Sequence, residues 1–151
     1  MRGVHLTNGA VLIGFTVTNG ATREISGEPP ISWMGGGGVF CESSSALVSN
    51  CVIVGNAAGQ GGGVYNGTVN NCILKDNKAD WYGGGVSDSI LRNCALSGNT
   101  AGYGGGAVFA TLNNCTLTAN SPNGADSCTL NNCILFYNTP QITRLLFGRT
   151  H

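Results

Sequence analysis

Few side chains in this sequence could carry acid–base chemistry. Two carboxylates that face one substrate bond can act as acid and base. Asp76 and Asp80 come closest to such a pair, because both fall near one predicted turn, but Lys75 and Lys78 lie beside them. We therefore expect a solvated, charge-paired turn there, and we predict no catalytic residue. The acidic residues of the chain are Glu24, Glu28, Glu42, Asp76, Asp80, Asp88 and Asp126.

The histidines and cysteines give no nucleophile or metal site either. His5 and His151 stand at opposite ends of the chain, and no serine or cysteine is placed as a partner, so no catalytic triad is indicated. The cysteines lack the paired Cys-x-x-Cys spacing and the accompanying histidines of a metal centre. The triple-glycine runs lack the Gly-Lys-Ser/Thr ending of a phosphate loop. We expect no metal and no cofactor.

Five of the cysteines belong to an internal repeat instead. They recur at intervals of 18 to 22 residues, at Cys51, Cys72, Cys94, Cys115 and Cys133. An asparagine precedes each one, a large aliphatic residue follows two positions later, and a second asparagine follows five positions later. The aliphatic residues are Ile53, Leu74, Leu96, Leu117 and Leu135, and the second asparagines are Asn56, Asn77, Asn99, Asn120 and Asn138. Agreement in several columns at one period predicts a repeat architecture.

The apolar residues within each unit alternate, as in Cys72 and Leu74, and glycines separate the units. That pattern predicts short strands joined by tight turns. Stacked units of this kind form an all-β, single-stranded parallel β-helix (solenoid) of about six coils, with ~21 residues and three short strands per coil. An earlier unit fits with Phe15 in the cysteine column. We expect the β-helix over residues 1–139, an insertion loop at about 21–34, and a non-repeat tail or cap at 140–151.

The columns have expected structural roles. Stacked cysteine side chains point the same way, which disfavours disulfide geometry, so we expect free and buried thiols. Cys41 and Cys128 lie outside the column, and we expect them to be partly exposed. Glycine suits corners that need positive φ or close backbone contact. Asparagine tolerates left-handed backbone, and its amide can bond to the asparagines above and below it.

Aromatic residues recur just before the glycine corner, at Trp33, Trp81, Tyr82 and Tyr103. Because the corner stacks from coil to coil, we expect these side chains along one edge of the solenoid. Two interpretations remain open. The aromatics either form a ridge that binds a glycan or another protein, or they shield the glycine-rich corner from water.

The units, which read x-N-C-x-[IL]-x-x-N with a following G-G-G-[VA], resemble the right-handed parallel β-helix repeats of the pectate-lyase-like superfamily. They are most similar to the repeats of polymorphic outer membrane proteins and related bacterial surface proteins, with Ile or Leu in place of the aromatic residue of the Phe-x-x-Asn motif. The resemblance covers roughly residues 4–139. It implies right-handed coils and a secreted or cell-surface protein, adhesive or directed at carbohydrate.

The composition of the chain excludes two classes of binding partner, nucleic acids and membranes. Seven basic and seven acidic residues give a net charge near zero, which argues against nucleic-acid binding. The sequence contains no run of ~20 apolar residues, so we expect no membrane insertion, and no signal peptide is visible.

The first coil has no obvious cap, so we expect a homodimer through this N-terminal end. At the other end, Ile142, Leu145, Leu146 and Phe147 could cover the last coil.

Two functions remain. The first is a non-catalytic structural or adhesive module, which binds glycan or another surface protein along the aromatic edge. The alternative is a fragment or relative of a polysaccharide lyase or glycoside hydrolase, in which case carboxylates and a basic residue should share one groove.

Overall fold

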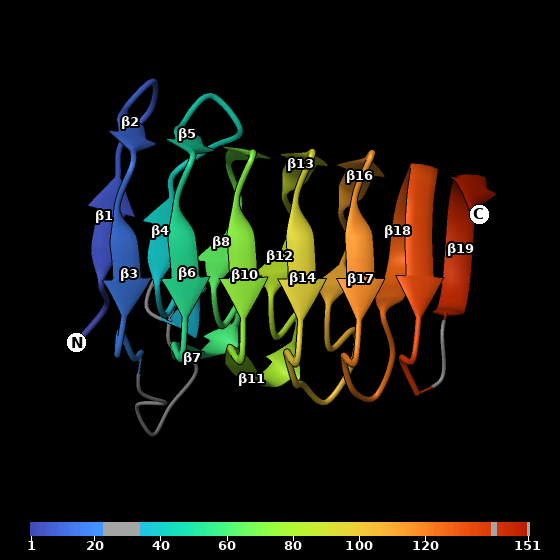
Figure 1. The fold of residues 1–151 in the computed structure, drawn as a ribbon. Helices are drawn as coiled ribbons and strands as arrows, with labels where there is room; N and C mark the ends of the chain where they lie inside the picture. The colour runs from blue at the N-terminus through green and yellow to red at the C-terminus, as the bar shows by residue number, and fades with distance from the viewer. Residues whose placement is uncertain (23–33, 140–141, 151) are drawn as a thin grey trace.

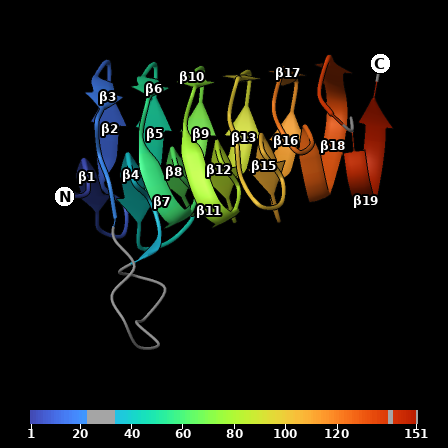
Figure 2. The ribbon, with the colours of Figure 1, turned by 90° about the horizontal axis from the view of Figure 1, so that it is seen from below.

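The computed structural model describes residues 1–22, 34–139 and 142–150, and it shows a parallel β-solenoid (Figure 1). Successive coils stack along one axis, with the two ends of the chain at opposite ends of the stack (Figure 2). The described residues contain no helix of the length and apolarity that a membrane span requires. The predicted insertion falls mainly on residues 23–33, which lie outside the described part.

Each coil contributes one strand to each of three faces. The first face contains β1 (Val4–Leu6), β4 (Val39–Cys41), β8 (Val64–Tyr65), β12 (Val86–Ser87) and β15 (Ala107–Val108). The second face contains β2 (Val11–Ile13), β5 (Leu47–Ser49), β9 (Thr68–Asn70), β13 (Ile90–Arg92) and β16 (Thr111–Asn113). The third face contains β3 (Thr16–Thr18), β6 (Val52–Val54), β10 (Ile73–Lys75), β14 (Ala95–Ser97) and β17 (Thr116–Thr118).

The long strand β18 (Ala125–Phe136) completes the sixth coil, because it pairs in turn with β15, β16 and β17. We number the coils 1 to 6 from the N-terminus, and five turns separate them, as the aliphatic column from Val17 to Leu135 records. Two further strands, β7 (Ala57–Gln60) and β11 (Lys78–Tyr82), pair at the glycine corner. The strand β19 (Ile142–Thr150) continues the stack by pairing in parallel with β18.

The core is a set of inward columns. Leu74, Leu96 and Leu117 are fully buried on the third face, and Val69, Leu91 and Leu112 are fully buried on the second. The side chains of each strand alternate in burial, as the pattern exposed–buried–exposed of β10 shows. The parallel β-solenoid predicted from the alternation is therefore confirmed, with three strands per coil and about 21 residues per turn.

Buried asparagines link the coils along one corner. The backbone N–H and the side-chain Nδ2 of Asn77 both donate to Oδ1 of Asn99 at 3.0 Å. Asn99 donates in the same way to Asn120, and its Nδ2 also donates to the carbonyl oxygen of Leu74. Asn77 and Asn99 are 0% exposed. The ladder satisfies polar groups that would otherwise be buried without a partner.

The asparagines that precede the cysteines allow the backbone to turn. Asn50, Asn71, Asn93, Asn114 and Asn132 all adopt φ between 51° and 54°. Asparagine takes this left-handed conformation more readily than other residues with a side chain. At the corner between the third and first faces Gly83 has φ of 63°, and a Cβ on Gly84 would clash with the carbonyl oxygen of Thr100. Both predicted roles of asparagine, and both of glycine, are confirmed.

The N-terminal end leaves apolar surface uncovered. Within the described residues β1, β2 and β3 each pair on one side only. Phe15 occupies the inward cysteine column, yet it is 59% exposed, whereas Cys51 is 2% exposed. A hollow of about 340 Å³ lies at this end, and Phe15, Val4 and Leu12 are part of its lining. The first coil therefore presents apolar side chains and unpaired strand edges together.

We predict that replacing Asn99 by leucine destabilises the protein by at least about 3 kcal/mol, since several buried groups lose their partners at about 1–3 kcal/mol each. Urea unfolding measures the change. Asn131→Ala is the control, because Asn131 is exposed although it also bonds to an asparagine of the previous coil, at 3.1 Å. Similar losses in both variants would contradict a special contribution from the buried ladder.

For a chain that consists of residues 1–151, we also predict end-to-end association of two copies through the first coil, because pairing would cover both the apolar side chains and the strand edges. Sedimentation should show dimers at micromolar concentration, and Phe15→Lys should give monomers. Phe136→Lys places the same charge on the third face, where Phe136 is 41% exposed, and should leave the dimer intact. A wild-type protein that stays monomeric at high micromolar concentration would refute the prediction.

Candidate functional site

The cysteine column is part of the core. All seven cysteines are free and buried. The thiols of Cys72, Cys94 and Cys115 each donate to the backbone carbonyl two residues earlier, at 3.2 to 3.3 Å. The prediction of free, buried thiols is confirmed, and these hydrogen bonds give the sulfurs of Cys72, Cys94 and Cys115 a partner inside the protein.

The expectation of partly exposed thiols at Cys41 and Cys128 is wrong, since both are 0% exposed. The sulfur of Cys41 packs against Gly67 of the next coil, where the missing side chain leaves room for it. Cys128 lies inward in β18 and its thiol donates to the carbonyl of Asp126. Burial raises the pKa of both thiols to about 12.

The described residues contain no cluster of three or more His, Cys, Asp or Glu side chains able to hold a metal ion. The acidic residues there occur singly or beside partners. Asp76 lies 3.7 Å from Lys75 in an exposed ion pair, and Asp88 accepts a hydrogen bond of 2.6 Å from Ser87. Glu42 contacts His5 at 3.2 Å. Glu24 and Glu28 lie outside the described residues.

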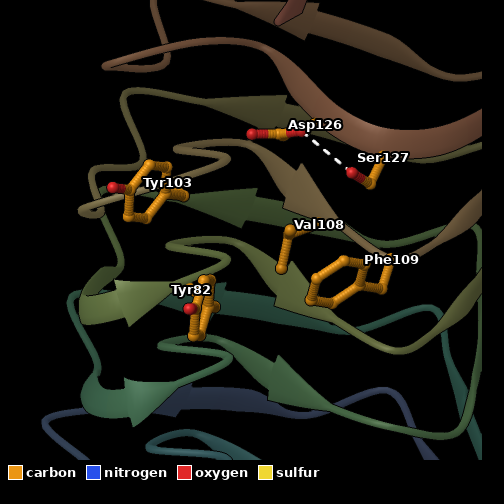
Figure 3. Close-up of a pocket in the computed structure, with 6 residues that line it drawn as sticks. All are labelled: Tyr82, Tyr103, Val108, Phe109, Asp126 and Ser127. Atoms are coloured by element: carbon orange, nitrogen blue, oxygen red, sulfur yellow. Dashed lines mark hydrogen bonds between the residues drawn. The ribbon is translucent and has the colours of Figure 1, made fainter. Parts of the chain in front are cut away.

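An aromatic pocket opens near the glycine corner of coils 4 to 6. Its volume is about 190 Å³, and its lining is Tyr82, Tyr103, Val108, Phe109, Asp126 and Ser127. Figure 3 shows Tyr103 and Phe109 on opposite sides, with Tyr82 toward coil 4 and Asp126 toward coil 6. Tyr103 is 58% and Phe109 53% exposed, so both rings offer surface to a ligand.

The strands and the corner bring these residues together. Tyr82 and Tyr103 are aligned by a parallel bridge, and their rings stack with centroids 5.8 Å apart. The ring of Phe109 lies 6.0 Å from that of Tyr82. Val108 and Asp126 are register partners on the first face. The pocket therefore has an apolar floor and aromatic walls.

The polar end of the pocket comes from coil 6. Ser127 Oγ donates to Asp126 Oδ1 at 3.1 Å, the bond drawn in Figure 3. The backbone of Arg144 in β19 is in register with Asp126. The carboxylate oxygens of Asp126 and the oxygen of Ser127, whose proton is donated to Asp126, can accept hydrogen bonds from the hydroxyl groups of a ligand. Among the described lining residues Asp126 is the single carboxylate.

The sequence-predicted aromatics are divided between two places. Tyr82 and Tyr103 line the pocket, whereas Trp81 is half-buried and packs on the backbone of Gly59. Trp81 thus covers a glycine, which agrees with the interpretation that the aromatic residues shield the glycine-rich corner from water. Trp33 lies outside the described residues.

Val108, Phe109, Asp126 and Ser127 line the pocket but were not predicted from the sequence, and Phe109 is the most exposed of them. Phe109 also has an unusual backbone conformation. It has φ of 50° and occupies a turn position where other coils have Asn66, Asp88 and Ser127. A bulky residue in the left-handed region is strained, and such strain concentrates at functional sites. Alignment of this column was the signal that could have revealed it, because phenylalanine stands where the other coils have small polar residues.

The fold defines the class of protein as a parallel β-solenoid with an aromatic pocket on one edge. Comparison of the chain with models of known families, with curated proteins and with solved structures gives no match. The function must therefore be argued from the pocket.

We predict that no cysteine of the native protein reacts with Ellman's reagent at pH 8, and that all seven react in guanidinium. Burial keeps all seven thiols from the reagent, and the raised pKa of about 12 also keeps Cys41 and Cys128 neutral at pH 8, whereas a cysteine of the unfolded chain has a pKa of about 8.5. Since the folded state holds the protons of Cys41 and Cys128 more tightly, their contribution to the free energy of unfolding should be complete below pH ~8.5 and should be lost as the pH rises toward 12. Rapid titration of any native thiol would contradict the burial.

Proposed function

We propose that this protein is a non-catalytic carbohydrate-binding module, and that the aromatic pocket holds the sugar. The observation that carries the proposal is the combination of exposed Tyr103 and Phe109 rings with the hydrogen-bonding pair Asp126 and Ser127 in one cavity. Apolar walls with a few fixed polar groups are typical of small-ligand sites. A sugar ring has the matching chemistry, with apolar C–H faces and hydroxyl groups at its edge.

The rigidity of the site supports binding. Tyr103 and Val108 belong to a coil that is hydrogen-bonded on both sides, so the pocket is held in place by backbone pairing. Little side-chain or loop ordering is then required when a ligand enters, which favours affinity. The resemblance of the repeats to bacterial surface proteins supports a secreted or cell-surface location, where glycans are accessible.

The pocket is poorly suited to the alternative function of a polysaccharide lyase or hydrolase. Hydrolysis by the usual mechanism needs two carboxylates across one glycosidic bond. Asp126 is the one carboxylate that lines the described pocket, and Asp76 and Asp88 do not line it. We therefore favour binding without turnover.

We predict that Tyr103→Ala weakens glycan binding at least about tenfold, since truncating an aromatic anchor costs more than about 1.4 kcal/mol. A panel of cello-, xylo-, manno-, chito- and galacturonate oligosaccharides, measured by calorimetry with parallel lyase and hydrolase assays, tests this. Tyr137→Ala is the matched control, because Tyr137 is 82% exposed and does not line the pocket. Turnover of any panel member would refute the non-catalytic role.

Phe109→Asn separates binding from folding. Asparagine already occupies the equivalent position at Asn66 with φ of 61°, so the backbone strain is relieved while the ring is lost. We expect weaker glycan binding together with an unchanged or higher unfolding temperature. Unchanged affinity in this variant would argue against Phe109 as a wall of the site.

A further inference from the structure

One edge of the solenoid carries aromatic rings on coils 2 to 5. In coils 2 and 3 the ring comes from the first face. Phe40 and Tyr65 stack with centroids 5.5 Å apart and nearly parallel planes, and the guanidinium of Arg2 lies 4.3 Å from the centroid of Phe40. The ring of Tyr65 packs on Gly35 at the corner, where a side chain would not fit.

In coils 4 and 5 the ring comes from the corner instead. Tyr82 and Tyr103 supply it, and the first face has the smaller Ser87 and Val108 in the column that contains Phe40 and Tyr65. A small residue on one side thus accompanies a ring from the other side. In coils 2 to 5 this edge is therefore covered by a ring from either the first face or the corner.

Coil 6 supplies no such ring among its described residues. Its contribution to the lining is Asp126 and Ser127. Between Asn120 and Ala125 the corner has four residues, whereas the corner of coil 5, between Asn99 and Ala107, has seven. The part of the corner that would carry the next aromatic residue after Tyr103 is therefore missing. The short corner is what opens the aromatic pocket.

We propose that the pocket takes a single terminal sugar ring, which occupies the position where coil 6 lacks an aromatic side chain. This inference rests on the proposed function. Among the described residues of coils 2 to 6, coil 6 alone lacks a ring on this edge, and the stacked rings of Phe40 and Tyr65 already cover coils 2 and 3. The volume of about 190 Å³ is below the ~300–1,000 Å³ of sites for drug-sized ligands, so one ring fits and an internal stretch of polysaccharide does not.

End recognition predicts a short ligand. Dissociation constants are measured for the mono-, di-, tetra- and hexasaccharides of the glycan series that binds best. Those of the di-, tetra- and hexasaccharide should agree within about threefold. Affinity that rises at each added residue would overturn the inference and leave the proposed function standing. A wild-type protein that binds no glycan in the panel would refute both.

Restoring the missing ring should close the site. Insertion of Gly-Tyr-Gly between Pro122 and Asn123 lengthens the corner of coil 6 to the seven residues of coil 5. We expect at least a tenfold loss of binding to the preferred disaccharide, with an unfolding temperature equal to or above that of the wild type. Insertion of Gly-Ser-Gly is the control of equal length, and it should bind the disaccharide within threefold of the wild type. Equal effects of the two insertions would overturn the proposal.

Discussion

The parallel backbone pairing between successive coils is the constraint on which the rest of the structure depends. Because each coil bonds to the next in register, a residue type at one position of the repeat becomes a column along the axis. Inward columns must then suit their own copies about 4.8 Å away. Leucine, valine and cysteine meet this condition by packing. Asparagine meets it because its amide both donates and accepts, so Asn99 satisfies Asn77 and is satisfied by Asn120.

The corners of each coil have different requirements from the faces. A chain that turns three times in about 21 residues needs left-handed backbone at fixed positions, and Asn71, Asn93 and Gly83 supply it. Turns of this kind leave no room for side chains on the inside, which explains the glycine runs. Outside the corner no such limit holds. Aromatic rings can cover the glycines there, as Trp81 does at Gly59.

The inward part of this arrangement could be predicted from the sequence, because column after column repeats the same residue type at one period. The pocket could be predicted only in part. Tyr82 and Tyr103 precede glycine runs and were visible as an edge. Phe109 and Asp126 come from positions where the residue type changes between coils, so the repeat did not mark them. For Phe109 the available signal was its difference from the small polar residues Asn66, Asp88 and Ser127 of the same column. The shorter spacing between Cys115 and Cys133 was visible as well, but its meaning required knowing which columns face the corner.

The separation between inward and outward columns explains how such a fold can carry a binding site at little structural cost. Removing three residues from the corner of coil 6 leaves the inward columns continuous, since Leu117 still pairs with Leu135 and Asn120 still bonds to Asn138. The shorter corner changes only the outer surface of the solenoid, where the described residues of coil 6 contribute no aromatic ring next to Tyr103. A change in corner length thus creates a cavity next to Tyr103 without creating one in the core. Cavities in a core cost stability in proportion to their size, whereas a surface pocket that water fills does not.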